Sequence, residues 1–294
     1  MRAYIRLLRP HQWTKNLFVF TGIVFSHRWG EAGLWYQVIS AAVAFSLASS
    51  GIYAINDVAD REQDRAHPRK RRRPVASGAV SPLQALIVGA GCLALALALV
   101  AQVSLVAFWL LTAYILMNGA YSFRLKHVVV LDIFIIAAGF MLRLLVGTEG
   151  VGIEPSRWLL LCGFMLTLFL GAAKRRAELM EIAGRDEESA GRHHGQRRVL
   201  DDYTPALLDL ILGITATASI ITYGLYTMSP EVIRIQGTAN LIYSLPLVIY
   251  ALFRYLYRLY GHGSGGDPST DLFRDPHLLA VGLLWVVVTL ALLS

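Results

Sequence analysis

The stretch that decides the fold is GIYAINDVADREQDRAHPRKRRRPVASG, residues 51–78. It continues a long apolar run and then places four acidic residues and seven Lys or Arg residues in a short polar segment. Asn56 and Asp57 begin a pattern, N-D-x-x-D-x-x-x-D, that continues with Asp60 and Asp64. Spacings of three and four residues put the carboxylates on one face of a helix. We therefore expect the chemistry of this protein at the polar end of a hydrophobic helix.

The apolar run before this segment is one of many along the chain. Of the 294 residues, 55% are hydrophobic and 16% are charged, whereas an average soluble domain is about 25% charged. A helix needs about 20 apolar residues to cross a bilayer, and the runs lack the two-residue alternation of barrel strands. We predict an all-α membrane protein with about nine transmembrane helices. Their expected limits are 17–35, 36–55, 82–101, 104–122, 129–147, 157–173, 206–228, 238–256 and 277–294.

The distribution of positive charge predicts the orientation. With the N-terminus in the cytoplasm, 23 of the 27 Lys and Arg residues fall in cytoplasmic segments. Arg28, Arg157 and Arg234 then lie outside, and Arg143 lies within a span. Because positive residues favour the inner side, we predict a multi-pass membrane protein with a cytoplasmic N-terminus and its chemistry on the cytoplasmic face. Membrane lipid headgroups or an anionic substrate explain the basic loops, so no nucleic-acid partner is expected.

The chain is expected to form one membrane domain, residues 1–294. Its predicted cytoplasmic loops are about 57–81, 123–128, 174–205 and 257–276. The two longest follow the second and sixth predicted helices, which suggests two related four-helix halves without a residue-level repeat. The oligomeric state is left open.

The spaced aspartates predict a metal site. Three like charges on one helical face repel one another, and a divalent cation removes this penalty. Mg²⁺ prefers oxygen ligands, keeps several waters and bridges to substrate phosphates. We therefore expect Mg²⁺ at Asp57, Asp60 and Asp64. The alternative is a solvated helix end whose acids pair with Arg61 and Arg65.

With this motif at the end of the second of about nine helices, the chain resembles the UbiA superfamily of intramembrane prenyltransferases along essentially its whole length. The resemblance implies a nine-helix bundle in which the motif binds Mg²⁺ and a diphosphate. Within the superfamily, the chain is most similar to the branch that makes polyprenyl-phosphate phosphoribose. The segments that carry this closer similarity are RPHQWTKNLFVF (9–20), HPRKRRRPVASG (67–78), YSFRLKHVVVLDIFIIAAGFMLRLLVG (121–147) and AKRRAEL (173–179).

One departure from the superfamily pattern concerns the donor. Typical members carry a second aspartate-rich motif after the sixth helix, but this chain reads KRRAELMEIAGRDEE there. The first acid is Glu178, and it follows Lys174, Arg175 and Arg176. This puts a second Mg²⁺ in doubt, whereas the extra bases suit a donor with more phosphate charge than a prenyl diphosphate. Such a donor is 5-phosphoribosyl 1-diphosphate, with a diphosphate at C1 and a phosphate at C5.

The resemblance thus implies transfer of 5-phosphoribose from 5-phosphoribosyl 1-diphosphate to a polyprenyl phosphate, with release of diphosphate. Mg²⁺ would neutralise the leaving group, and the transition state would have oxocarbenium character. The acceptor phosphate is ionised near pH 7, so no strong general base is needed, and direct attack inverts C1. The product would feed arabinofuranose donors for a bacterial cell envelope.

The same resemblance assigns roles to individual residues. The predicted catalytic residues are Asp57, Asp60, Tyr121 and Lys126. The predicted substrate-binding residues are Lys15, Asn16, Asn56, Lys70, Arg71, Ser122, Asp132, Lys174, Arg175 and Glu178. Further candidates on the same side are Arg73, Arg197, Arg198, Asp202 and Tyr203.

Simpler roles stay open for several of these residues. Anchoring at the membrane interface or ordinary ion pairing would equally explain Lys15, Asn16, Tyr121, Asp132, Lys174 and Glu178. Arg143, deep in a span, is expected to snorkel or to make a structural hydrogen bond. Asp275 is expected in a polar connector.

Two other functions are compatible with parts of this sequence. A UbiA-type prenyltransferase, moving a prenyl group to an aromatic or lipid acceptor, shares the first acidic motif, but the basic segment 173–179 argues against it. A lipid transporter would place charges along a pathway and break helices near the midplane. Here the charges gather at one face, which favours an enzyme.

Overall fold

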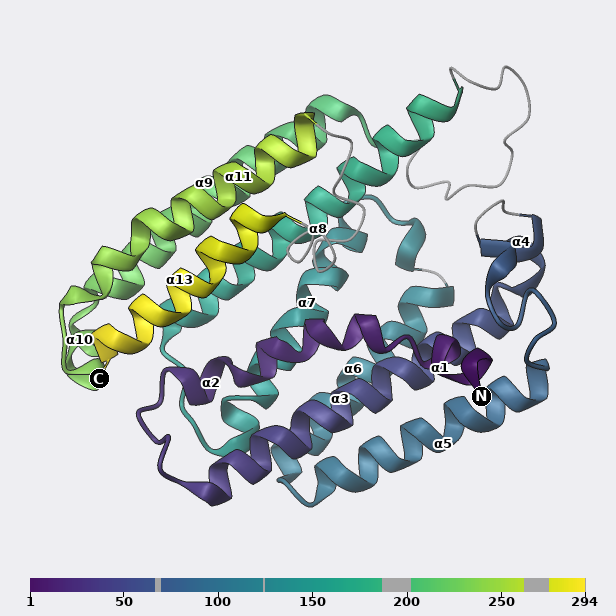
Figure 1. The fold of residues 1–294 in the computed structure, drawn as a ribbon, viewed down its shortest axis with the longest axis horizontal. Helices are drawn as coiled ribbons and strands as arrows, with labels where there is room; N and C mark the ends of the chain where they lie inside the picture. The colour runs from purple at the N-terminus through teal and green to yellow at the C-terminus, as the bar shows by residue number, and fades with distance from the viewer. Residues whose placement is uncertain (67–69, 124, 187–201, 262–274, 294) are drawn as a thin grey trace. The chain divides into compact units, whose positions relative to one another are not determined.

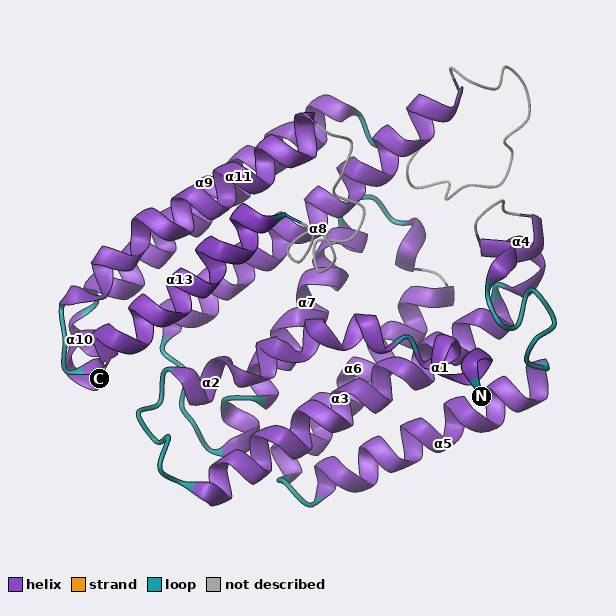
Figure 2. Ribbon diagram, in the orientation of Figure 1, coloured by secondary structure: helices purple, strands orange, loops and turns teal. Residues whose placement is uncertain are grey.

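A computed structural model describes residues 1–66, 70–123, 125–186, 202–261 and 275–293, and every regular element in these ranges is helical (Figure 2). The chain divides into two compact units. Residues 1–125 and 142–154 form the first unit, and residues 126–141 and 155–294 form the second. The single domain expected from the sequence remains a prediction.

The first unit surrounds one long helix, α3. Its elements are α1 (Arg2–Leu8), η1 (Pro10–Phe20), α2 (Thr21–Val24), α3 (Ala32–Ala59), α4 (Arg61–Ala66), η2 (Lys70–Arg72), α5 (Pro82–Ala101), α6 (Leu105–Phe123) and η4 (Glu149–Val151) (Figure 1). The start of α5 follows from its sequence. The Ser81 hydroxyl accepts a hydrogen bond from the Gln84 backbone N–H, and the Gln84 side chain accepts one from the Ser81 N–H. This capping box satisfies two N–H groups that a helix start leaves unpaired.

Small residues bring α3 and α5 together. A Cβ atom added to Gly51 would lie 2.7 Å from the carbonyl oxygen of Gly89, closer than side-chain contacts allow. Such glycine contacts let membrane helices pack backbone against backbone. Phe45, Leu111 and Val146 are among the fully buried side chains of the adjoining core. The core therefore fixes α3, whose polar end carries the acidic motif.

The predicted span 17–35 is wrong as a single helix. The chain instead runs as a 3-10 helix to Phe20 and as α2 to Val24, and regular structure resumes only at Ala32. The polar residues between them form turns, and His27 has a positive φ of 53°. Close contact also explains the irregularity, because a Cβ on Gly22 would lie 2.0 Å from the Gly147 carbonyl oxygen.

The second unit is a bundle of longer helices. It contains residues of α7 (Leu131–Val146) up to Met141, followed by α8 (Arg157–Asp186), α9 (Pro205–Met228), α10 (Pro230–Gln236), η6 (Asn240–Ser244), α11 (Leu245–Gly261) and α13 (Pro276–Leu293). The short η3 (Leu125–His127) precedes α7. The hydroxyl of Thr204 caps α9 by accepting from the Leu207 N–H, and Pro205 takes the first helical position, where no N–H is needed. Ile133, Phe169 and Leu208 belong to the core of this unit.

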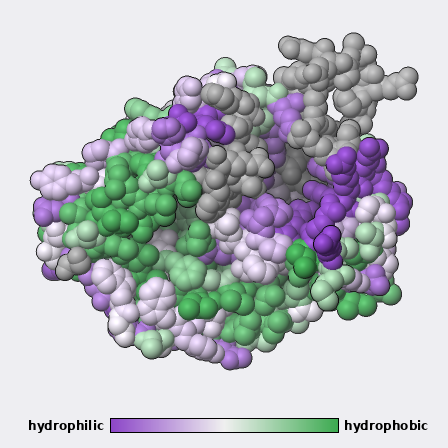
Figure 3. All heavy atoms as spheres, viewed as in Figure 1, coloured by the Kyte–Doolittle hydropathy of each residue, from purple (hydrophilic) through white to green (hydrophobic). Residues whose placement is uncertain are grey.

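Most predicted spans are confirmed as helices. Among the described residues, seven helices are long and apolar enough to cross a membrane. An eighth span results if Pro230–Gln236 and Asn240–Gly261, which meet at 96°, count as one. Exposed apolar side chains suit a lipid environment, and Figure 3 shows such a surface where α13 lies in Figure 1. The exposed residues there are Leu283, Leu284, Val286, Val287 and Leu290. The chain is therefore a multi-pass helical membrane protein.

Candidate active site

The acidic motif lies where α3 ends. The N–H of Asp60 donates to the carbonyl of Asn56 at 2.9 Å, and the N–H of Asp64 donates to the carbonyl of Asp60 at 2.8 Å. The helix is interrupted at Asp60, and α4 begins at the next residue. Asp57 and Asp64 nevertheless lie near the same nitrogen of Arg73. Asp57 and Asp64 are buried, with 1% and 2% of their surfaces exposed, whereas Asp60 is half-buried.

Two arginines contact the buried acids. Arg9 Nη2 lies 2.5 Å from Asp57 Oδ1. Arg73 Nη1 lies 2.7 Å from Asp64 Oδ2 and 3.5 Å from Asp57 Oδ1. The Arg9 guanidinium also lies 4.8 Å from the centre of the Tyr53 ring. Arg9 has φ 50° and ψ 59°, a left-handed conformation that costs free energy in any residue except glycine. The chain therefore adopts an unfavourable turn at the residue whose side chain reaches Asp57.

A cavity of about 450 Å³ opens beside Asp57, a volume typical of small-molecule sites. Its lining residues are Ile5, Arg6, Arg9, Pro10, His11, Asp57, Arg72, Arg73 and Pro74. Arg9 and Arg73 contact the Asp57 carboxylate there, and Arg6 and Arg72 line the same cavity. Figure 3 shows hydrophilic residues gathered where α4 lies in Figure 1. Guanidinium groups bind phosphates through paired hydrogen bonds. The cavity therefore suits an anion with several phosphate charges.

The buried acids also fit the predicted Mg²⁺. Asp57 Oδ2 is buried and has no hydrogen-bond partner among the described residues, so an oxygen of the kind that Mg²⁺ prefers is available there. Asp57 and Asp64 converge on the same cationic nitrogen of Arg73. In the described part of the chain, no three His, Cys, Asp or Glu side chains gather as a complete metal site. Water and substrate phosphate would supply the remaining ligands, and the role of Asp60 stays a prediction.

Asn16 lies in a buried network of the first unit. Arg143 Nε donates to Asn16 Oδ1 at 2.7 Å, and Asn16 Nδ2 donates to Ser46 Oγ at 2.8 Å. Arg143 Nη2 also donates to Tyr114 Oη at 2.8 Å. These contacts confirm the expected structural hydrogen bonds of Arg143. They also give Asn16 a structural role, while its predicted phosphate contact remains a prediction.

The other predicted residues of the first unit lie in η1, in η2 and towards the ends of α3 and α6. Lys15 Nζ donates to Gln12 Oε1, and Ser122 Oγ donates to the carbonyl of Asn118 at 2.9 Å. Two further residues are half-buried, Asn56 and Tyr121, and two are exposed in η2, Lys70 and Arg71. Their substrate contacts remain predictions.

In the second unit, three predicted substrate-binding residues contact one another. Arg175 is fully buried and forms ion pairs with both Asp132 and Glu178. Tyr203 Oη donates to Asp132 Oδ1 at 2.6 Å. Buried charges require such partners, so the structure supports the ion-pair alternative for Asp132. Substrate contacts of these three residues remain predictions.

The remaining predicted residues of this unit are Lys174, Lys126, Arg197 and Arg198. Lys174 is half-buried on α8. The side chain of Lys126 lies outside the described residues, as do Arg197 and Arg198.

A further arginine network joins α8, α9 and α11. Arg176 Nε donates to Asp209 Oδ1 at 2.6 Å, and Tyr260 Oη donates to the same oxygen at 2.7 Å. The Arg176 guanidinium lies 3.8 Å from the centre of the Tyr260 ring. The sequence offered the bases of 173–179 as phosphate ligands, but the structure pairs both Arg175 and Arg176 with carboxylates.

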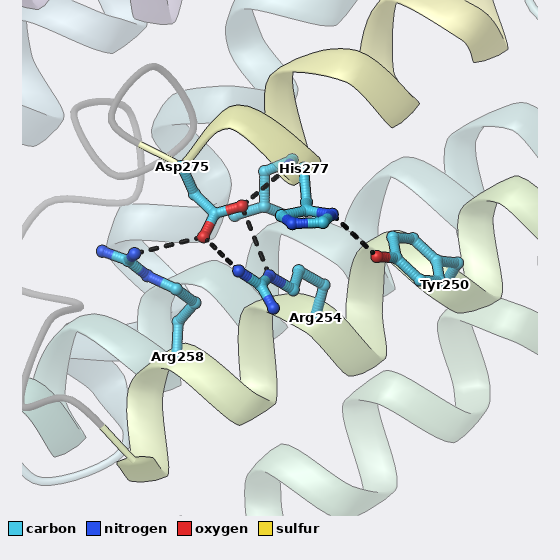
Figure 4. A network of polar contacts seen from close by, with 6 residues as sticks. Tyr250, Arg254, Arg258, Asp275 and His277 are labelled. Atoms are coloured by element: carbon cyan, nitrogen blue, oxygen red, sulfur yellow. Dashed lines mark hydrogen bonds and ion pairs between the residues drawn. The ribbon is translucent and has the colours of Figure 1, made fainter.

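Asp275 links α11 to α13 (Figure 4). Its carboxylate accepts hydrogen bonds from Arg254 Nη2 at 2.9 Å, from Arg258 Nη1 at 3.1 Å and from the Leu278 backbone N–H at 2.9 Å. Hydrogen bonding from Arg254 holds the pKa of Asp275 well below its ordinary value. The expected polar connector is therefore a buried helix cap between two arginines.

Sequence reasoning missed three arginines of the cavity, Arg6, Arg9 and Arg72. Arg9 stands directly before Pro10 in one of the family-like segments, and this was the available signal. Its contact with Asp57 depends on how α1 folds back onto α3. Leu7 directs that packing, because it is fully buried in a small cluster with Ala54 of α3.

The fold and this site define a helical membrane enzyme with an acidic motif and an arginine-lined cavity at one helix end. Residues 17–274 match the UbiA prenyltransferase family, and the chain belongs to that family. It is 35% identical to a protein of Mycolicibacterium smegmatis named decaprenyl-phosphate phosphoribosyltransferase, over 96% of this chain and 89% of that protein. A protein of Mycobacterium tuberculosis with the same name is 33% identical, over 96% and 91% of the two chains.

Solved structures confirm the fold. A UbiA homologue from Archaeoglobus fulgidus, bound to GPP and Mg²⁺, superimposes with a TM-score of 0.73 over 99% of both chains at 20% identity. A UbiA homologue from Aeropyrum pernix gives a TM-score of 0.63 over 96% of both chains at 16% identity. The predicted family and its helical fold are thus confirmed.

Proposed function

We propose that the protein transfers 5-phosphoribose from 5-phosphoribosyl 1-diphosphate to a polyprenyl phosphate and releases diphosphate. The observation that carries this proposal is the cavity at Asp57, which four arginines line and where two of them contact the carboxylate. A donor with phosphates at both C1 and C5 supplies the charge to match them. The named activity of the mycobacterial relatives supports the same reaction.

In the proposed reaction, an oxygen of the acceptor phosphate attacks C1 of the donor. The bond from C1 to the diphosphate oxygen breaks, and its electron pair leaves with the diphosphate. Arg9 and Arg73 would stabilise the charge that develops on this leaving group, and Lys70 and Arg71 extend the same basic cluster. Mg²⁺ held at Asp57 and Asp64 would neutralise the same charge. The acceptor phosphate is already ionised near pH 7, so the chain supplies no general base.

The finer topology forms part of the proposal. The eight helical spans gain a ninth if η1 and α2 cross the membrane. A 3-10 helix rises about 2.0 Å per residue, against 1.5 Å in an α-helix, so these fifteen residues extend about 28 Å, close to the thickness of the hydrocarbon core. With nine spans and a cytoplasmic N-terminus, the acidic motif faces the cytoplasm, where 5-phosphoribosyl 1-diphosphate would be available. Protease access to an N-terminal tag in sealed vesicles of known orientation tests this arrangement.

The second candidate function is transfer of a prenyl group from a prenyl diphosphate to an aromatic or lipid acceptor. The Archaeoglobus homologue, with the same fold, was solved with GPP and Mg²⁺. This reaction accounts for the acidic motif. It offers fewer phosphate charges for the arginines that line the cavity.

A paired assay on purified protein in detergent decides between the two. One reaction receives Mg²⁺, 5-phosphoribosyl 1-diphosphate and decaprenyl phosphate, and the other receives Mg²⁺, a prenyl diphosphate and 4-hydroxybenzoate. We expect a phosphoribosylated lipid in the first reaction, detected by mass spectrometry and abolished by EDTA. Product in the second reaction alone would contradict the proposal and leave the family assignment intact.

A further inference from the structure

Val130, at the start of α7, holds a backbone conformation that its residue type disfavours. Its φ is 68°, in a left-handed region that β-branched residues rarely occupy. Val130 is 40% exposed, so burial of its side chain does little to offset the free-energy cost of this backbone conformation. Its carbonyl accepts from the N–H groups of Ile133 and Phe134 at 3.0 and 3.1 Å. The strained residue therefore forms the cap of α7, directly after the segment that carries Lys126.

One hydroxyl group holds the backbone of Val130. The N–H of Val130 donates to Tyr203 Oη at 2.7 Å, and this hydroxyl donates to Asp132 Oδ1 at 2.6 Å. Tyr203 is buried, with 4% of its surface exposed. Burial and the hydrogen bond to Asp132 raise the pKa of Tyr203 above its ordinary value. The hydroxyl therefore remains a donor at every working pH.

The acid that orients Tyr203 is itself fixed. Asp132 is fully buried, and its second oxygen forms the ion pair with Arg175. Arg175 is fully buried as well and also pairs with Glu178. A chain of contacts thus runs from α8 through Asp132 and Tyr203 to the backbone of Val130. Strained conformations persist where the surroundings over-determine them, and they cluster at functional sites.

We infer that Tyr203 is a positioning residue, which holds segment 126–130 and thereby sets the place of Lys126. The inference rests on the proposed function and on the sequence-based prediction that Lys126 is a catalytic residue of that reaction. Tyr203 touches no substrate in this role. It acts through the backbone that leads into α7.

The test combines removal of the hydroxyl with relief of the strain. Tyr203→Phe keeps the ring and removes both hydrogen bonds, and we expect kcat to fall about tenfold to a hundredfold, because a misplacement of about 1 Å can cost that much. Donor KM should change much less. In this background Val130→Gly should restore much of kcat, since glycine adopts a positive φ without strain. Val130→Ala should not restore it.

Tyr260→Phe is the matched control, because Tyr260 also donates to a carboxylate of the second unit. It should leave kcat unchanged. Amide hydrogen exchange gives a readout that needs no activity, and residues 126–132 should exchange faster in Tyr203→Phe but not in Tyr260→Phe. Unchanged exchange in Tyr203→Phe overturns the inference, whether or not the protein transfers phosphoribose. If wild type is active, equal loss of kcat with glycine and with alanine at Val130 also overturns it.

Discussion

Two buried aspartates of this protein, Asp57 and Asp275, each contact two arginines. They differ in whether both carboxylate oxygens accept hydrogen bonds from described residues. Asp275 uses both carboxylate oxygens, which accept from Arg254, Arg258 and the Leu278 backbone N–H. Within the part of the chain that the structure describes, Asp57 is contacted through Oδ1, and its buried Oδ2 has no hydrogen-bond partner. A cavity lined by four arginines adjoins Asp57.

The comparison shows that the number of arginines does not distinguish a ligand site from a link between helices. The distinguishing features are an unsatisfied acceptor and space beside it. A buried acceptor without a partner lowers the stability of the fold by about 1–3 kcal/mol. A ligand that binds Asp57 Oδ2 would remove this cost, which favours a ligand site there. Asp275, whose acceptors are satisfied, serves α11 and α13 instead.

The largest expected effect is a loss of activity, and it tests whether Asp57 and Asp275 differ in function. Asp57→Asn removes the charge that contacts Arg9 and that we propose binds Mg²⁺, so kcat/KM for phosphoribosyl transfer should fall about 10²–10³-fold. Asp275→Asn should keep kcat/KM within about twofold of wild type, because Asp275 lies in a saturated structural network. Initial rates of lipid product formation measure both variants. Similar losses in the two variants would contradict the distinction between them.

Substitutions of the arginines test the same difference between Asp57 and Asp275, with smaller expected effects. Arg9→Gln and Arg73→Gln should each raise KM for 5-phosphoribosyl 1-diphosphate by about ten- to a hundredfold, since a hydrogen bond to a charged group contributes about 1.5–3 kcal/mol. Arg254→Gln is the matched control, because it removes an arginine from Asp275 and none from the cavity. Donor titrations at fixed acceptor measure KM. An Arg254→Gln variant with the same donor defect would show that the cavity is not the donor site.

The sequence predicted the helical class and seven of the helices because long apolar runs determine these by length alone. It predicted the family through the acidic motif and the family-like segments. It failed at 17–35, where a 3-10 helix and a turn replace one span. The polar residues 26–33 interrupted the apolar pattern there, but hydropathy does not reveal the close contact of Gly22 with Gly147.

The candidate site was predicted in part. Asp57 and Asp64 followed from their spacing, whereas Arg9 did not, because its role depends on contact between segments far apart in sequence. The bases on α8 have carboxylate partners that the sequence did not reveal, since Asp132 and Asp209 lie 43 and 33 residues from Arg175 and Arg176. Their substrate contacts stay a prediction. Local charge patterns thus identify candidate residues for a site. Ion pairs between segments far apart in sequence decide which of these side chains can also bind a ligand.

The smallest predicted effect concerns stability in acid. Because the pKa of Asp275 is lower in the folded protein than its ordinary value, this group stabilises the fold at pH values above about 4. That contribution is lost as the pH falls towards the folded pKa. Asp275→Asn should lower the unfolding temperature at pH 6, at a cost of about 1 kcal/mol. The variant should then lose less further stability than wild type between pH 5 and pH 3.

Glu31→Gln supplies the matched control for this acid effect. The Arg28 side chain lowers the pKa of Glu31 as well, but both side chains of this pair are exposed, and exposed ion pairs contribute little. Its unfolding profile in acid should therefore match that of wild type. If Asp275→Asn and Glu31→Gln both followed the wild-type profile, the Asp275 network would not stabilise the link between α11 and α13. Saturation of a carboxylate by arginines would then say nothing about structural purpose, and the assignment of Asp57 would depend on its cavity alone.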